Sequence, residues 1–348
     1  MELNKELLKF IGVDLIPEDR NYWFVRTQKG TYYNEFYNEN YIGIEWDKVS
    51  DLEILNTAKE ETIKSLVEKE YPEKDRSGYI GGQIYRFVQT MKKGDIVIIP
   101  SQGSVWLAFG ELVDDNVYLL EEDKEKEFEE ILEEFYDETQ ADIDEKTVLK
   151  KRRKVKWIKT VKRTELDPQL YKIIYSHNTI VDAKDYSFFI DRMLSNFFIK
   201  GEEAYYTFKV NKKNNINYKD MLSFLNNNEN MIEALSRKYP ELNINSDELI
   251  LKISVQSKGP ISFKGTVKNM LYIGLLYGAL FGVKFDLNAF GMEINFETEG
   301  IPKWISMYSE VVNNNKEIKD SEEIKELYEK LKADFDNLEI DEPKKIAQ

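Results

Sequence analysis

The sequence concentrates positive charge in one stretch, KKRRKVKWIKTVKR, residues 150–163, which contains nine Lys and Arg and no acid. Ammonium and guanidinium groups bind phosphate oxygens, so a strand that exposes them can lie along a nucleic-acid backbone. In KVKW, strand alternation places Val155 and Trp157 on one face and Lys154 and Lys156 on the other. The stretch therefore predicts a strand that packs on one face and binds phosphate on the other.

Two features of this stretch stay open at the level of sequence. The alternation slips by one residue at Ile158 and Lys159, where either a β-bulge returns Lys159 to the cationic face or the strand simply ends. The cations of 150–153 follow an acidic run at 121–146, and pairing with it as exposed ions would contribute little stability. The acidic run itself indicates a solvated helix, with an autoinhibitory arm over the basic strand as the alternative.

Residues that could catalyse a reaction are scarce. His177 is the only histidine and the chain has no cysteine, so neither a Ser/His/Asp set nor a thiolate zinc site can be assembled. The sequence contains neither HExxH nor GxxxxGK[ST], and Gly81 with Gly82 predicts a flexible turn and no phosphate loop. We therefore predict no catalytic residue, no metal site and no cofactor.

One alternative to this prediction is a metal-dependent nuclease in the C-terminal half. Such a site needs clustered carboxylates beside a lysine. The closest pattern is DELILKIS, where Glu248 and Lys252 would share a strand face and Ile250 stands where the lysine belongs. Glu248 and Asp286 are the residues whose substitution would test this alternative.

Composition sets the class of protein. A chain of 348 residues with 42% hydrophobic and 13% aromatic residues predicts two packed domains. Its formal net charge of −15 argues against a protein coated in nucleic acid, although a local basic surface remains compatible with it. The absence of cysteine fits a reducing cytoplasm, and the N-terminal residues show no secretory signal, so we expect a cytoplasmic protein. The apolar run 270–283 is too short to span a bilayer and predicts a buried helix, so no stable membrane insertion is expected.

The N-terminal part is rich in short strand patterns bounded by turn residues. Helical spacing separates the second strand from the third, over 51–74 and again over 81–95. We predict an N-terminal domain over 1–165, with the acidic helix at 121–146 inserted in it. The expected strands are 21–27, 41–46, 94–100, 105–112, 116–120 and the basic stretch itself.

The C-terminal part predicts a helical connector at 166–200, followed by an α+β domain at 201–348. Glycines recur every four residues at Gly274, Gly278 and Gly282, which allows close packing on the domain's own sheet or at a subunit interface. The terminal helix would be capped by Asp320. The expected elements are a strand at 204–211, a helical pair or one broken helix at 217–240, a strand pair at 248–265, the apolar helix, strands at 283–288 and 291–298, and a C-terminal helix at 319–338.

The N-terminal pieces, in their order and spacing, resemble the PUA-like, EVE-like modules at the N-termini of Mrr-type and other modification-dependent restriction proteins. The resemblance covers about residues 20–165, and the C-terminal half shows no nuclease pattern of the kind those proteins often carry. Positions typical of these modules are held here by Trp23 and Arg26, Gly43 and Trp46, Gly94 and Asp95, Gly110, and Arg153 with Val155 and Trp157.

The resemblance implies a pocket in which a modified base, taken out of the stack, lies between aromatic walls. Each aromatic residue assigned to it can instead belong to the core, and the adjacent carboxylate can instead cap a turn. The implied base-binding residues are Trp46, Trp23, Tyr33, Phe36, Trp106 and Asp47. The implied phosphate-binding residues are Arg26, Lys29, Arg86, Lys154, Lys156 and Lys159.

The sequence thus predicts an α+β protein, with a PUA-like small β-barrel and flanking helices followed by a C-terminal α+β sandwich. The expected function is a DNA-binding sensor of a bacterial antiviral defence or restriction system, in which the first domain reads a modified or flipped base. The second domain would bind an effector protein or self-associate. A non-catalytic scaffold that binds protein partners is, with the nuclease, the other alternative.

Overall fold

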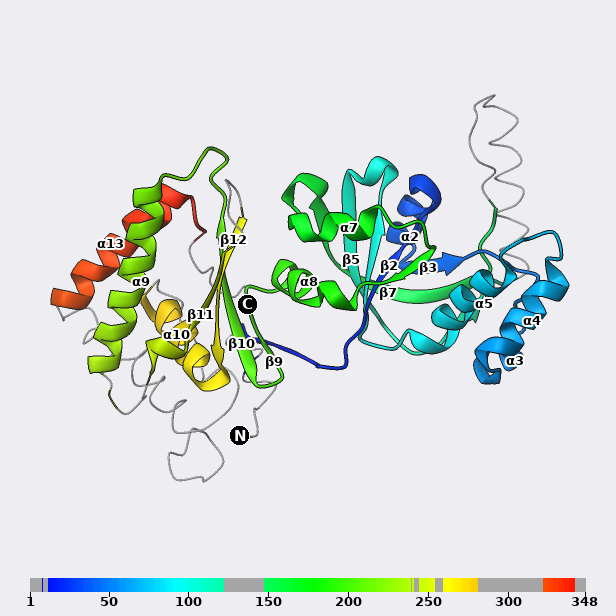
Figure 1. The fold of residues 1–348 in the computed structure, drawn as a ribbon, viewed down its shortest axis with the longest axis horizontal. Helices are drawn as coiled ribbons and strands as arrows, with labels where there is room; N and C mark the ends of the chain where they lie inside the picture. The colour runs from blue at the N-terminus through cyan, green and yellow to red at the C-terminus, as the bar shows by residue number, and fades with distance from the viewer. Residues whose placement is uncertain are drawn as a thin grey trace, which may run out of the picture. The chain divides into compact units, whose positions relative to one another are not determined.

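Figure 1 shows a computed structural model of the chain, which describes residues 8, 12–121, 147–238, 240, 244–253, 259–280 and 322–341. The chain forms two compact units. The inner unit is Asp19–Ile190, and the flanking unit combines Met1–Glu18 with Asp191–Gln348. This division differs from the expected boundaries at 165 and 200, because strand β1 (Asp14–Ile16) pairs with β9 (Phe197–Lys200) far along the chain.

The inner unit is a mixed α/β structure built on one curled sheet that forms a half-barrel (Figure 1). The strand order is β3-β7-β5-β4-β2-β8, and β6 pairs with β7. Among the described strand pairs of this sheet, β2 with β4 is the parallel one. The strands are β2 (Tyr22–Val25), β3 (Tyr41–Ile44), β4 (Ile96–Pro100), β5 (Trp106–Leu112), β6 (Tyr118–Leu119), β7 (Lys151–Lys162) and β8 (Ile180–Asp182).

Short helices connect these strands. Gly81 lies inside one of them, packed against Lys64, so the predicted flexible turn at Gly81 and Gly82 is wrong. The α-helices are α2 (Tyr33–Asn38), α3 (Leu52–Thr57), α4 (Glu60–Glu70), α5 (Ser77–Tyr85), α7 (Tyr171–Ile174) and α8 (Ser187–Leu194), in which the division into units falls. A π-helical turn, η2 (Arg86–Thr90), continues α5. The 3-10 turns are η1 (Gln28–Gly30), η3 (Gln102–Ser104), η4 (Arg163–Glu165), η5 (Pro168–Leu170) and η6 (Lys184–Tyr186).

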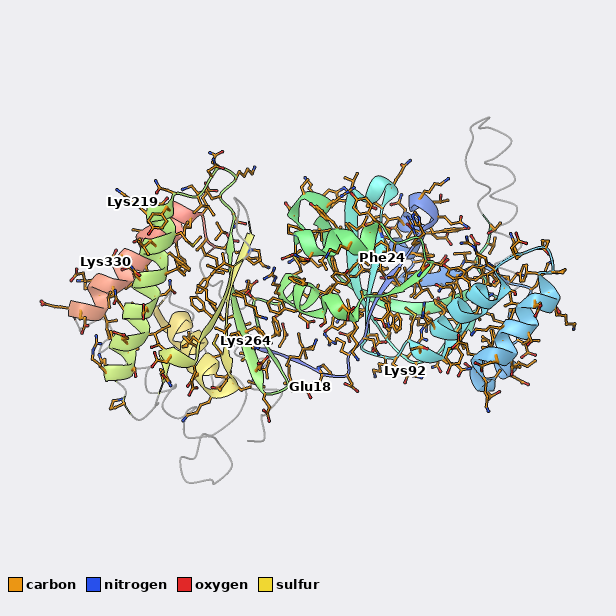
Figure 2. All side chains as sticks on the ribbon, in the orientation of Figure 1. Glu18, Phe24, Lys92, Lys219, Lys264 and Lys330 are labelled. Atoms are coloured by element: carbon orange, nitrogen blue, oxygen red, sulfur yellow. The ribbon has the colours of Figure 1, made fainter. Side chains whose placement is uncertain are left out.

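The curled sheet is buried on both faces at β2 and β4, which explains why these two strands are apolar at every position rather than alternating. One face carries Trp23 and Val97 and packs with helices α4 and α5 in a single cluster. The opposite face carries Phe24, labelled in Figure 2, and its strand neighbour Ile98.

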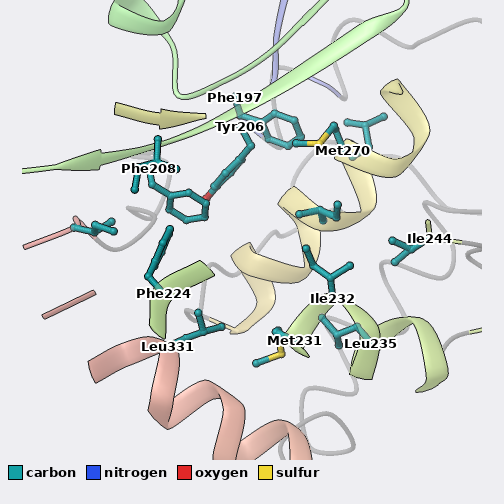
Figure 3. Close-up of a cluster of buried hydrophobic side chains, with 14 of the residues drawn as sticks. Phe197, Tyr206, Phe208, Phe224, Met231, Ile232, Leu235, Ile244, Met270 and Leu331 are labelled. Atoms are coloured by element: carbon teal, nitrogen blue, oxygen red, sulfur yellow. The ribbon is translucent and has the colours of Figure 1, made fainter. Parts of the chain in front are cut away.

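The flanking unit places a mostly antiparallel sheet against three helices. Its strand order is β1-β9-β10-β12-β11, with β1 parallel to β9. Phe208 of the sheet meets Phe224 and Phe335 of two helices at ring distances of 5.4 and 5.5 Å, and Figure 3 shows the first of these contacts. The further elements are β10 (Glu203–Val210), α9 (Tyr218–Lys238), η8 (Ser246–Glu248), β11 (Ile250–Ile253), β12 (Gly259–Thr266), α10 (Val267–Leu280) and α13 (Glu322–Leu338).

The C-terminal half differs in part from the elements that its sequence predicts. Residues 218–238 form one continuous helix, neither a helical pair nor a broken helix. A Cβ on Gly274 would overlap the ring of Phe197, so this glycine lets α10 lie against its own sheet. Across the described ranges, no helix has the length and apolar character needed to cross a bilayer. Residues 122–146, Gly282, Asp286, the strands at 283–288 and 291–298 and the cap Asp320 lie outside the described residues.

Candidate nucleic-acid interface

The first three cations of β7 point into the inner unit. Lys151 and Arg153 have no exposed surface, and Arg152 retains 5%. The Lys151 ammonium lies 2.7 Å from the Asp47 carboxylate and donates to the carbonyl of Trp46 at 2.9 Å. These three side chains therefore hold the unit together and do not form the exposed ion pairs considered for 150–153.

The two arginines are held by strands and helices that lie far away in sequence. Arg152 lies 4.1 Å above the Tyr41 ring and 3.4 Å from the Glu35 carboxylate, to which the Tyr41 hydroxyl also donates. Arg153 donates to the Phe87 carbonyl at 2.8 Å. Burial lowers the pKa of Arg153, as it does that of Lys151, because both guanidinium and ammonium groups lose hydration. The start of the basic strand is thus a structural anchor.

Trp46 and Asp47 sit where this anchor meets β3. Trp46 has a φ of 70°, a left-handed conformation that is rare for a bulky side chain, and its ring is half-buried. Asp47 accepts from Lys151 and, at 3.4 Å, from the backbone amide of Lys150. The strained backbone of Trp46 is therefore fixed by a buried lysine, and the Asp47 carboxylate is engaged within the unit.

The structure places Trp23 and Phe36 in the core rather than on an open pocket wall. The Trp23 indole donates to Asp95 at 2.8 Å, and the same carboxylate accepts from the backbone amide of Lys92. Phe36 is fully buried and stacks on Tyr32 at 5.7 Å. Of the other implied base-binding residues, Tyr33 is half-buried and Trp106 is exposed.

The slip in the alternation of the basic strand is a β-bulge. Phe109 of β5 pairs with Lys159, whereas the next residue, Gly110, pairs with Trp157, so Ile158 is the extra residue. The bulge returns Lys159 to the face of Lys154 and Lys156, and that one of the two alternatives is confirmed. Lys154 and Lys156 are exposed, and Lys159 is half-buried.

The implied phosphate-binding residues do not form one group. Lys154 and Lys156 lie near the start of β7. The Arg86 guanidinium contacts the Ile180 carbonyl at 3.5 Å, one residue from Thr179, to which the Arg26 amide donates. Arg26 and Lys29 belong instead to a segment beside the far end of β7, where Lys162 lies eight residues beyond Lys154, or about 26 Å along an extended strand. A single phosphate-binding surface must therefore be sought at one end of the strand.

Four segments without a single acid converge at that far end. Together they carry five Lys and Arg, namely Arg26, Lys29, Lys162, Arg163 and Lys172. The nearest acids along the chain are Glu35, which turns toward Arg152, and Glu165, Asp167 and Asp182. We call this surface the acid-free end; it consists of residues 26–33, 101–106, 161–163 and 171–179.

Hydrogen bonds tie these segments together. The Thr27 hydroxyl donates to the Pro100 carbonyl at 2.6 Å, and the backbone amide of Arg163 donates to Val105 at 2.9 Å. The backbone amide of Arg26 donates to Thr179 at 2.9 Å. Gly30, at a φ of 106°, lies so close to Gln102 that a Cβ there would overlap its backbone, which brings η1 against η3. The five cations are thus carried by a hydrogen-bonded framework.

Aromatic rings accompany the cations at the acid-free end. Trp106 is 39% exposed, and the Lys162 ammonium, its cross-strand partner, lies 5.1 Å from its ring. Tyr175 is 64% exposed, and the Arg163 guanidinium lies 5.5 Å from its ring and 5.4 Å from that of Tyr171. Trp106, Arg26 and Lys29 were predicted from the sequence as binding residues, whereas Lys162, Arg163 and Tyr175 were not.

Comparison with known proteins gave one family match. Residues 23–183 match the model of a family described as a domain of unknown function (DUF8426). The matched range lies within the inner unit and includes the whole acid-free end. Comparisons with curated proteins and with solved structures gave no match.

The nuclease pattern considered for the C-terminal half does not have the expected geometry. Glu248 lies in η8, before β11 begins, so it does not share a strand face with Lys252. Its carboxylate accepts from the side-chain amides of Asn269 at 2.9 Å and Asn245 at 3.3 Å. Lys252 instead lies 5.8 Å from the Tyr205 ring. The prediction that Glu248 and Lys252 lie on one strand is wrong.

Proposed function

We propose that the inner unit binds nucleic acid at the acid-free end. The observation that carries this proposal is the convergence of five cations, with no acid in their segments and an exposed tryptophan among them, in a chain of net charge −15. Lysine and arginine contacts to phosphate supply most of the sequence-independent affinity of nucleic-acid-binding proteins. The negative charge elsewhere on the chain repels a polyanion and would orient it toward this surface.

The test measures the binding of fluorescently labelled DNA to the full chain by anisotropy at several salt concentrations. The double variant Lys162→Gln/Arg163→Gln removes two cations of the acid-free end. We expect weaker binding and a log–log salt slope smaller by about 2, since each lost phosphate contact reduces the slope by about 1.

The matched control is Lys154→Gln/Lys156→Gln, which removes two exposed cations of the same strand outside the acid-free end. Its affinity and salt slope should equal those of the wild type. Equal losses in both double variants would assign binding to net charge alone and contradict the assignment to this surface.

The finer proposal is that the inner unit is a PUA-like module that reads a modified or flipped base in DNA, within a bacterial defence or restriction system in the cytoplasm. It is supported by the resemblance of the strand motifs, the curled sheet and the strained, half-buried Trp46. Strained backbone conformations cluster at binding sites, where surrounding contacts maintain them. The flanking unit would then contact an effector or a second copy.

Matched duplexes bearing cytosine, 5-methylcytosine or 5-hydroxymethylcytosine test base reading with the full chain. A preference for one modified duplex that disappears in Trp46→Ala is the expected result. Equal affinity of the wild type for all three duplexes would contradict recognition of these modifications, while leaving phosphate binding at the acid-free end intact.

A further inference from the structure

We infer that the acid-free end takes unpaired nucleotides, so that its ligand is a single-stranded nucleic-acid segment whose bases stack on Trp106 and Tyr175. This inference rests on the proposed binding of nucleic acid and names the class of ligand. Of the base-binding residues that the resemblance implies, it uses Trp106 and not Trp46.

Trp106 is positioned to offer its ring to a ligand. It is the first residue of β5, two residues after the end of η3, and its backbone is fixed by a 2.9 Å hydrogen bond from its amide to the Ser101 hydroxyl. The Lys162 ammonium lies 5.1 Å from the ring, and 39% of the residue remains exposed. A base that stacks on this ring would have its phosphate within reach of a lysine already in place.

Tyr175 repeats this pairing of an exposed ring with a cation. Its hydroxyl accepts from Arg163 at 2.5 Å, and the guanidinium also lies near the Tyr171 ring. The Tyr171 hydroxyl in turn donates to the Arg163 carbonyl at 3.0 Å. Lys162 is the last residue of β7 and Arg163 follows it, so the two ring–cation pairs lie at the same end of the strand.

The exposed rings favour a single-stranded ligand over a duplex. In a duplex each base is already stacked, so a protein that binds only its backbone uses cations and has no need of exposed aromatic rings. An unpaired base presents a free π-face, and stacking on an aromatic side chain contributes about fivefold to 140-fold in affinity per base. Cations beside exposed rings are therefore the arrangement expected for single strands.

The experiment compares three labelled ligands with the full chain by fluorescence anisotropy: a single-stranded DNA, the single-stranded RNA of the same sequence and the corresponding DNA duplex. Trp106→Leu and Tyr175→Leu remove a ring and keep an apolar side chain. Ile158→Ala, which truncates another exposed apolar residue of the inner unit, is the matched control. Circular dichroism of each variant verifies the fold.

The expected result is tighter binding of a single strand than of the duplex, with a loss of about fivefold or more in Trp106→Leu and no loss in Ile158→Ala. The DNA and RNA arms show which sugar is preferred. Unchanged single-strand affinity in both leucine variants, with binding still reduced in Lys162→Gln/Arg163→Gln, would overturn the inference and leave the proposed function standing. Failure of the wild type to bind any of the three ligands would overturn both.

Discussion

At the scale of single residues, the nine cations of 150–163 divide into two kinds by what surrounds them. Lys151 is buried against Asp47 and the Trp46 carbonyl, whereas Lys154 and Lys156 face solvent. Removing one partner of a buried ion pair leaves the other charge without compensation, and this costs far more than removing an exposed ion. Identical residue types in one strand should therefore differ greatly in their effect on stability.

Lys151→Met should lower the free energy of unfolding by about 3 kcal/mol, because it leaves the Asp47 carboxylate and the Trp46 carbonyl without their donor. Urea unfolding monitored by tryptophan fluorescence measures this loss. The double variant Lys151→Met/Asp47→Asn should recover part of it, and Lys154→Met should change stability by less than about 0.5 kcal/mol. Equal effects of Lys151→Met and Lys154→Met would contradict the anchoring role of Lys151.

The buried Tyr41 makes the stability of the inner unit depend on pH in the alkaline range. Burial, followed by the neighbouring Glu35 charge, raises the pKa of Tyr41 above its ordinary value of 10.0. Above pH 10 the unfolded chain loses this proton while the folded state keeps it, so stability is full below pH 10 and falls as pH rises. Urea unfolding between pH 9 and pH 11 should show this decrease, and Tyr41→Phe should reduce its slope. An unchanged slope in Tyr41→Phe would show that other groups account for it.

At the scale of elements, helix α5 contains glycines with opposite roles. A Cβ on Gly81 would lie 2.6 Å from Cγ and 2.7 Å from Cα of Lys64, whereas a Cβ on Gly78 would meet nothing within 4 Å. Gly81→Ala should therefore destabilise the protein by about 1–3 kcal/mol by forcing α4 and α5 apart. Gly78→Ala, its matched control, should stabilise it by about 0.5–1 kcal/mol, since alanine is the better helix former. Thermal unfolding of the two variants measures these effects, and a shift of both unfolding midpoints in the same direction would contradict the packing of Gly81 against Lys64.

Local pattern predicted some features of β7 and could not predict others. Alternation and its slip predicted the exposed Lys154 and Lys156 and allowed the bulge at Ile158, because these properties follow from neighbouring residues. The burial of Lys151 depends on Asp47, more than a hundred residues earlier, and only the pairing of β3 with β7 brings the two together. Gly81 was assigned to a turn because sequence alone does not show that Lys64 packs against it.

The candidate site was predicted in part for the same reason. Arg26, Lys29 and Trp106 followed from the family resemblance, although they were grouped with cations from elsewhere on the sheet. Lys162 and Arg163 were within the basic stretch but could be linked to Trp106 only through the register of β5 and β7. Tyr175 lies in a segment predicted as a connector, and only its contact with Arg163 shows that it belongs to the acid-free end.

At the scale of the whole molecule, the flanking unit is formed by two chain segments, one that precedes the inner unit in sequence and one that follows it. Residues before Asp19 contribute Leu8, Val13 and Ile16, each at most 5% exposed, and strand β1 at the edge of the five-stranded sheet. The inner unit contains the entire acid-free end. The stability of one unit and the binding activity of the other should therefore respond separately to changes near the N-terminus.

Removal of residues 1–18 should weaken the flanking unit and leave nucleic-acid binding unchanged. The deletion takes three buried apolar side chains from the core, a loss of about 3 kcal/mol or more. Hydrogen exchange measured by mass spectrometry should show faster exchange in β9 and β10, with β5 and β7 unaffected. Unchanged protection of β9 would show that β1 contributes little to this sheet.

The pairing of β1 with β9 also sets an order of events during synthesis. Asp14 pairs with Phe198, 184 residues later, so at about 5–20 residues per second the ribosome supplies the second strand roughly 10–40 s after the first. The inner unit can fold in that interval, and its folding shortens the loop that must close before β1 meets β9. Protease treatment of ribosome-bound chains stalled before β9 emerges should spare the inner unit and remove residues 1–18. Residues translated before the inner unit are then among the last to acquire their place in the fold.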